Sequence, residues 1–94
     1  MFTAQEKIAI YRKAAENIES REGIGFCRGI EGAVFILFGY YVSFVSYNRL
    51  FPEIYQHESY YHGTYWWSVM GEGRLKRINI LLDEADKLEE SIKK

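Results

Sequence analysis

The residue types that define most chemistries are scarce in this sequence. Its 94 residues include a single cysteine, a single proline and two histidines. Because a disulfide needs two thiols, Cys27 cannot form one within the chain, and a lone thiol suits a reducing cytoplasm. No basic segment followed by an apolar run opens the sequence, so we expect no secretory signal and a cytoplasmic location.

An excess of charge of one sign is also missing. The chain has 12 basic and 13 acidic residues, which leaves a net charge of -1. Non-specific binding to nucleic acid needs a basic field, and we therefore predict no nucleic-acid partner.

No motif matches a metal, cofactor or catalytic site. His57 and His62 are five residues apart rather than four, so their rings would not share a helix face, and no third ligand suggests itself. The glycines of residues 23–29 lack the spacing and the preceding strand of a dinucleotide-binding turn. Neither a base for Cys27 nor a pair of groups for acid–base chemistry is evident. We predict a protein that is not an enzyme and holds no metal or cofactor.

Apolar and aromatic residues are concentrated in residues 23–48. Within this stretch, seven residues, six of them glycine or serine, recur at alternating steps of four and three, which places them on one stripe of a helix. The stripe consists of Gly25, Gly29, Gly32, Ile36, Gly39, Ser43 and Ser46. Each glycine inside a helix costs about 1 kcal/mol relative to alanine, so the stripe predicts another backbone packed closely against it.

We interpret this stretch as one helix over about residues 26–48. Its valine, isoleucine, phenylalanine and tyrosine content would also suit two strands hinged near Gly39. The small-residue pattern has no period of two, however, and the run is far longer than a typical strand.

The flanking segments predict the rest of an all-α, single-domain fold. Thr3 and Glu6 have the spacing of a capping box, ahead of an amphipathic helix over about 4–21. Pro52 suits the first turn of a short helix over 52–58. Residues 59–73 read as an aromatic-rich loop, and a second amphipathic helix follows over about 74–92. Its expected inward stripe is Leu75, Ile78, Leu82, Ala85 and Ile92, widened by Leu81 and Leu88.

Neither side of the predicted central helix is polar, because the side opposite the small residues carries Ile30, Val34 and Leu37. Two amphipathic helices cannot cover it completely, which predicts a larger assembly. We favour a homo-oligomer in which copies of this helix meet along Gly25, Gly29, Gly32, Gly39 and Ser43. A monomer with an extended aromatic core and a membrane span over 32–48 are the alternatives.

A candidate ligand site lies where the aromatic loop meets the last helix. Arg74 and Arg77 are predicted in the first turn of that helix, where the helix dipole disfavours cations and free amides favour anions. The neighbouring Trp66, Trp67 and Tyr61 offer stacking surfaces, and Arg28 is a further phosphate-binding candidate. The alternative is that the arginines pair with nearby glutamates and the tryptophans fill the core.

Three short motifs carry a resemblance to a known group of proteins. They are Gly25-Phe26-Cys27, Phe51-Pro52-Glu53 and Tyr65-Trp66-Trp67, followed by the arginine-led C-terminal helix. The combination resembles small accessory proteins of tailed bacteriophages. The resemblance implies a protein that antagonises bacterial defence, either as a homo-oligomeric sponge for a signalling nucleotide or by blocking a host protein through the aromatic loop. The sponge is our leading hypothesis and the protein-binding inhibitor is the alternative.

The sponge hypothesis predicts that cyclic nucleotides or ADP-ribose-type signals raise the melting temperature. Replacement of Arg74 by glutamate is expected to abolish this shift without unfolding the protein. A thermal-shift panel checks both statements, and no shift with any of these ligands would contradict the hypothesis.

Overall fold

The computed structural model describes residues 1–21, 23–42, 46–57 and 71–93. These residues contain five helices and no strand, which confirms the predicted all-α class. The helices are α1 (Ala4–Ser20), α2 (Phe26–Phe38), α3 (Tyr47–Leu50), α4 (Pro52–Tyr55) and α6 (Gly71–Lys93). No helix in the described ranges is long and apolar enough to cross a membrane.

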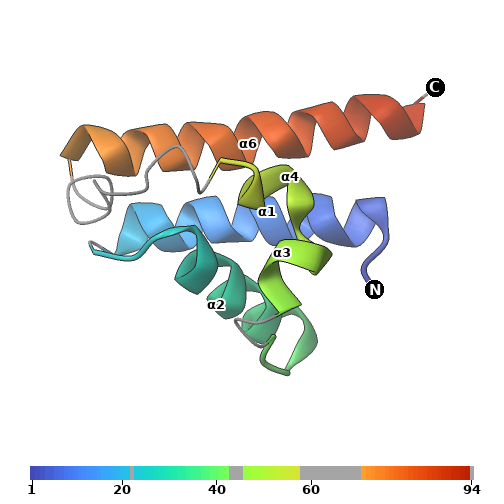
Figure 1. Cartoon of the computed structure of the whole chain (residues 1–94), viewed down its shortest axis with the longest axis horizontal. Coiled ribbons are helices and arrows are strands. Elements are labelled where there is room, and N and C mark those ends of the chain that lie inside the picture. The colour runs from blue at the N-terminus through green and yellow to red at the C-terminus, as the bar shows by residue number, and fades with distance from the viewer. Residues whose placement is uncertain (22, 43–45, 58–70, 94) are drawn as a thin grey trace.

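Helix α1, rather than the glycine-rich helix, is the central element. It packs against α6 on one side and against α2 on another, and α6 runs antiparallel to it (Figure 1). Arg12 of α1 forms ion pairs with Asp86 and Glu89 of α6, whereas Ile18 lies against α2. Because α1 packs against two helices, its buried residues form a wide arc: Ile8, Ile10, Tyr11, Ala14, Ala15 and Ile18.

The start of α1 is confirmed in detail. The Thr3 backbone N–H donates to the Glu6 carboxylate at 2.8 Å, and the Glu6 N–H donates to the Thr3 hydroxyl at 3.1 Å. This reciprocal capping box satisfies two amides that the helix itself leaves without partners.

The predicted single helix over 26–48 is wrong. Helix α2 ends at Phe38 because Gly39 adopts a left-handed conformation with φ of 81°, and its N–H donates to the Phe35 carbonyl at 2.9 Å. A left-handed glycine is a common helix end, since residues with a Cβ rarely adopt that conformation. The next described helix, α3, begins only at Tyr47.

Two glycines of the predicted stripe face α1 of the same chain. A Cβ on Gly29 would lie 3.1 Å from Ile18 Cγ1, and one on Gly32 would lie 3.1 Å from Asn17 Nδ2. The close approach that the stripe predicts is thus intramolecular at these positions. Gly25 and Gly39 cap the two ends of α2, and Ser43 lies outside the described residues.

Helix α6 begins at Gly71, three residues before the predicted start, so the C-terminal end of the predicted loop is helical. The remainder of that loop, residues 59–70, lies outside the described residues. The inward face also differs from the prediction, because Arg77 and Glu84 are buried whereas Leu75 and Leu82 are exposed. The predicted stripe contains apolar residues alone and so omits these two polar side chains. Arg77 lies over Phe26 of α2, and Glu84 lies against His57, which follows α4.

The short helix is confirmed with Pro52 at its start, but it ends at Tyr55 rather than 58. Its buried Ile54 joins the core, and Glu53 contacts α1. Helix α4 therefore packs beside both α1 and α6, as Figure 1 shows.

Replacement of Gly39 by alanine distinguishes the observed helix end from the predicted continuous helix. Inside a helix, the change would stabilise the protein by about 1 kcal/mol. At the observed φ it should instead cost about 1 kcal/mol, since no atom lies within 4 Å of the added Cβ and only the backbone conformation is disfavoured. Urea denaturation measures the difference.

The matched variant is Gly39→Asn, for which a smaller loss is expected because asparagine tolerates the left-handed region. An increase in stability in Gly39→Ala would show that α2 continues beyond residue 38.

Candidate functional site

Arg74 lies beside the C-terminal end of α1 and binds backbone carbonyls there. Its Nε donates to the Ile18 carbonyl at 3.0 Å, and its guanidinium also donates to the Glu19 carbonyl. These are carbonyls of the last turn of α1, which lack partners within the helix and carry its negative dipole end. No basic residue of α1 occupies that turn. Arg74 of α6 thus places a positive charge at the negative end of the α1 dipole. We therefore expect Arg74→Glu to lower the stability of the folded protein, whereas the sequence alone predicted that this variant would stay folded.

Arg77 is fully buried, and its guanidinium carbon lies 5.0 Å above the centre of the Phe26 ring. This cation–π contact joins α6 to the start of α2. The earlier start of α6 also moves Arg77 out of the first turn, so the predicted reason for a cation there does not apply. Arg74 and Arg77 both lie on α6, but Arg74 contacts the end of α1 and Arg77 contacts the start of α2.

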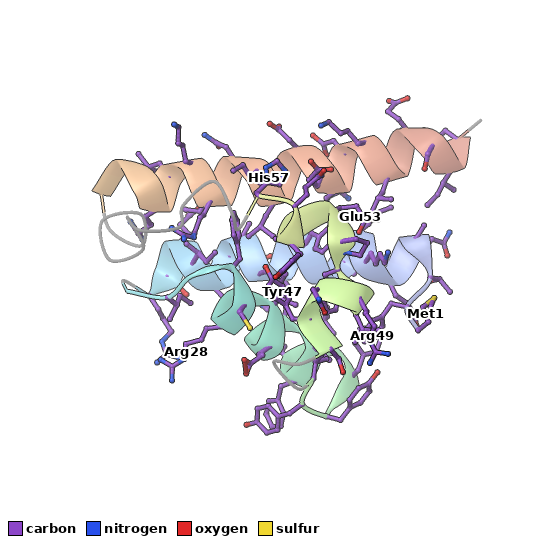
Figure 2. The ribbon with its side chains drawn as sticks, in the orientation of Figure 1. Met1, Arg28, Tyr47, Arg49, Glu53 and His57 are labelled. Atoms are coloured by element: carbon purple, nitrogen blue, oxygen red, sulfur yellow. The ribbon has the colours of Figure 1, made fainter. Side chains whose placement is uncertain are left out.

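The remaining predicted residues divide into two groups. Trp66, Trp67 and Tyr61 lie outside the described residues. Arg28 is exposed in the first turn of α2, on the opposite side of α2 from Arg49 in the view of Figure 2.

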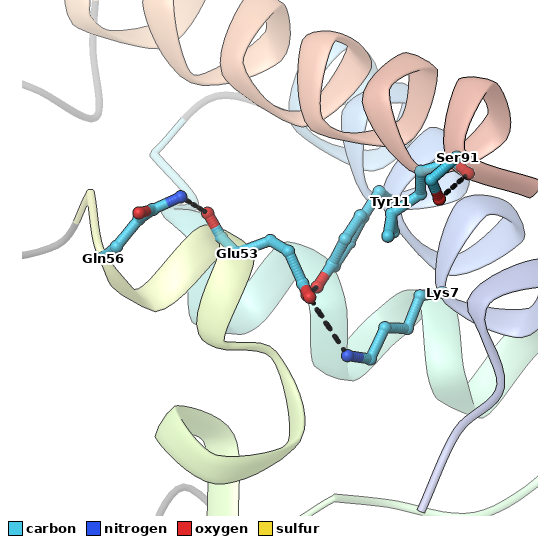
Figure 3. Close-up of polar contacts among 6 residues, drawn as sticks. Lys7, Tyr11, Glu53, Gln56 and Ser91 are labelled. Atoms are coloured by element: carbon cyan, nitrogen blue, oxygen red, sulfur yellow. Dashed lines mark hydrogen bonds and ion pairs between the residues drawn. The ribbon is translucent and has the colours of Figure 1, made fainter.

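A polar cluster joins α1 to α4. The Tyr11 hydroxyl donates to Glu53 Oε1 at 2.6 Å, and Lys7 Nζ forms an ion pair with Glu53 Oε2 at 3.2 Å (Figure 3). Burial, followed by the bond to Glu53, raises the pKa of the Tyr11 hydroxyl far above its ordinary value. The hydroxyl therefore stays protonated and acts as a fixed donor, so this cluster holds two helices together.

The pKa of the Glu53 carboxyl is shifted in the opposite direction. Burial alone would raise its pKa, but the Tyr11 hydrogen bond, a backbone hydrogen bond and Lys7 together lower it below the ordinary 4.5. The charged form is therefore the one that the folded protein stabilises.

A second polar contact joins α6 to the residues that follow α4. His57 Nε2 lies 3.0 Å from Glu84 Oε2, and Lys87 Nζ lies 3.5 Å from the same oxygen. This arrangement accounts for the burial of Glu84, which the expected inward stripe of the last helix does not include. No group of three or more possible metal ligands occurs among the described residues. The contact with Glu84 makes His57 a link between α6 and the residues that follow α4.

A candidate binding site in the described part of the chain is a groove between the C-terminal end of α1 and α2, with a volume of about 460 Å³. We call it the α1–α2 groove. Its lining residues are Asn17, Arg21, Ile24, Arg28, Glu31, Gly32, Phe35, Ile36 and Tyr41. Small-molecule sites typically have volumes of about 300–1,000 Å³, so the groove has a suitable size.

Local structure explains how the groove is formed. Asn17 Nδ2 donates to the Gly29 carbonyl at 3.1 Å, which fixes the amide beside Gly32. Any side chain at Gly32 would collide with this amide unless Asn17 moved. Beyond the end of α2, the ring of Tyr41 stacks on that of Phe35, with centroids 4.6 Å apart and planes 18° apart.

The groove combines a cationic part with an aromatic part. Arg21 and Arg28 supply two positive charges, and neither guanidinium has a hydrogen-bond or ion-pair partner within the described part of the chain. Glu31 supplies one negative charge and accepts a long contact from Cys27 Sγ at 3.5 Å. The two arginines therefore outweigh the single carboxylate, and Phe35 and Tyr41 provide ring faces nearby.

Sequence reasoning identified only Arg28 of this groove. A useful signal was present, because Arg28 lies in the first turn of a helix with no acidic residue in that turn, where the dipole disfavours a cation. We applied that criterion to Arg74 and Arg77, whose helix starts earlier than predicted. The contribution of Arg21, Asn17 and Tyr41 depends on the fold.

Comparison with protein-family models, curated proteins and solved structures finds no match for the chain. The resemblance to phage accessory proteins therefore rests on its short motifs and stays a prediction.

Acidification tests the role of the polar cluster. Because the pKa of Glu53 is lower in the folded state, its stabilising contribution is present above pH 4.5 and is lost as the pH falls through the lowered value. Urea denaturation at several pH values between 7 and 3 should show a smaller loss of stability on acidification in Glu53→Gln than in the wild type. Equal losses in the two proteins would contradict this role.

Proposed function

We propose that this protein is a non-enzymatic binding protein that holds a small anionic, nucleotide-like ligand in the α1–α2 groove. The supporting observation is the pairing of two arginines, Arg21 and Arg28, with the stacked rings of Phe35 and Tyr41 around one groove. A nucleotide has the two matching halves, a phosphate and a planar base. The proposal keeps the predicted class of ligand and moves the site away from α6.

The arginine end of the groove favours phosphate as the anionic group. A guanidinium presents its N–H donors in a planar fork that matches two phosphate oxygens. Both guanidinium groups lie at least partly in water, so binding a phosphate does not first require breaking an ion pair within the described residues. Glu31 would repel a second anionic group placed beside it, which gives the ligand a preferred direction in the groove.

The aromatic end favours a planar partner for the anion. Tyr41 is 71% exposed, and its ring is already held against Phe35. Stacking of a base on an aromatic side chain contributes about 1–3 kcal/mol, and a ring that is already ordered loses little freedom on binding. Inorganic phosphate alone should accordingly bind more weakly than a nucleotide.

The phage sponge remains the biological context that the sequence resemblance implies. A sponge needs only tight, non-catalytic binding, which a groove without a reactive group can provide. The alternative, an inhibitor of a host protein that acts through residues 59–73, stays a prediction because residues 58–70 lie outside the described residues.

A thermal-shift panel with matched charge reversals tests the proposal. Cyclic mono- and dinucleotides and ADP-ribose are added to the wild type, Arg28→Glu and Arg49→Glu. We expect at least one ligand to raise the wild-type melting temperature by about 5 °C at saturation. In Arg28→Glu its affinity should fall at least about tenfold, because a charge-assisted hydrogen bond is lost.

Arg49→Glu is the control, since Arg49 is exposed and does not line the groove. Arg28→Glu places an acid in the first turn of α2, which the dipole favours, so lost binding would not reflect a weakened helix. The absence of a shift with every ligand, or equal loss in both variants, would overturn the proposal.

A further inference from the structure

The C-terminal end of α2 carries a cluster of exposed apolar side chains. We call this the α2-end surface; it consists of Phe35, Ile36, Leu37, Tyr40 and Tyr41. Their exposed fractions range from 41% to 71%. The surface lies at the end of α2 away from α6, so it projects from the body of the molecule (Figure 1).

This surface has the composition of an interface core. Its residues include no charged side chain, and the sequence has none between Gly32 and Asn48. Interface cores are depleted of charge and enriched in tyrosine and phenylalanine, because burying these side chains leaves no charge without a partner. The exposed apolar area is on the order of 500 Å², given about 150–250 Å² for a fully exposed aromatic side chain. That area is near the upper end of what a monomeric protein leaves in water.

Ring stacking within the chain also holds the aromatic side chains of this surface in place. Tyr41 stacks on Phe35, and Tyr40 stacks on Phe2 of the N-terminal segment, with parallel rings 6.4 Å apart. Gly39 caps α2 between these pairs and sets the direction of the chain. Large side chains that are already held in place lose little conformational entropy on association.

We propose that the occupant of this surface is a second copy of the chain, related by a two-fold axis. Pairing the surface with itself would bury on the order of 1,000 Å² in total, which reaches the lower limit for a specific interface. A two-fold axis covers the same surface on both copies and leaves no free copy of it to recruit more chains. The net charge of -1 gives little repulsion between copies. The contact is therefore a dimer made by the outer side of α2, whereas the glycine side of α2 faces α1.

The dimer bears directly on the α1–α2 groove. Phe35, Ile36 and Tyr41 belong both to the groove lining and to the α2-end surface. A second copy seated on this surface would cover the aromatic end of the groove and limit the access of a base to Phe35 and Tyr41. The dimer does not depend on the proposed ligand, because it is measured on the ligand-free chain.

Sedimentation velocity of the full chain over about 1–500 μM tests the proposal, because interfaces near the lower limit of size are typically weak and transient. The wild type should dimerise in a concentration-dependent manner. Leu37→Glu places a charge in the α2-end surface at a residue that does not line the groove, and it should raise the dimer dissociation constant at least about tenfold. Leu75→Glu is the matched control, since Leu75 is 59% exposed on α6.

The proposal is overturned by a wild type that stays monomeric at the highest concentration. It is equally overturned if Leu37→Glu dimerises like the wild type, or if Leu75→Glu weakens the dimer as much. Circular dichroism shows whether Leu37→Glu is folded. If it is not, Leu37→Cys replaces it: a short thiol cross-linker should link Leu37→Cys chains into dimers more efficiently than Leu75→Cys chains, and equal yields would contradict the interface.

Lack of ligand binding would leave the dimer result unchanged. A monomeric wild type that still shows the nucleotide-dependent melting shift would remove the interface and keep the groove. The two proposals therefore fail separately.

Discussion

The packing of α1 between α6 and α2 is the constraint on which the other contacts depend. It requires a close approach of α2, which Gly29 permits because a Cβ there would lie only 3.1 Å from Ile18. The same approach brings Asn17 to the Gly29 carbonyl and leaves the groove beside it. A larger side chain at Gly29 would separate the helices, and both the core and the groove would change.

Polar contacts then fix the positions of the helices that surround α1. Arg74 from α6 covers the carbonyl end of α1, and Glu53 from α4 binds Lys7 and Tyr11 near its other end. Such contacts contribute modestly to stability, since folding exchanges them for bonds with water. Their larger effect is to select one arrangement, because a buried polar group without its partner is costly.

The sides of α2 have different roles as a result. One side meets α1, the lining of the groove combines cationic and aromatic residues, and the end carries the apolar surface that we propose pairs with a second copy. A helix that is apolar nearly all round therefore need not be a membrane helix or a fully buried one. Its excess apolar area can instead be concentrated at a single projecting end, where Gly39 stops the helix and directs the chain to Tyr40 and Tyr41.

The sequence by itself determined the elements whose signals are local. The capping box at Thr3, the amphipathic helix behind it and the start of α4 at Pro52 follow from interactions between residues a few positions apart. Only the tertiary structure decided which helix is central, that Gly39 ends α2, and that Arg74 contacts the end of α1 and Arg77 the start of α2. It also brought Arg21 and Tyr41 to the same groove as Arg28. These outcomes depend on contacts between residues far apart in the chain, and glycine or arginine patterns are compatible with several such contacts until the partners are in place.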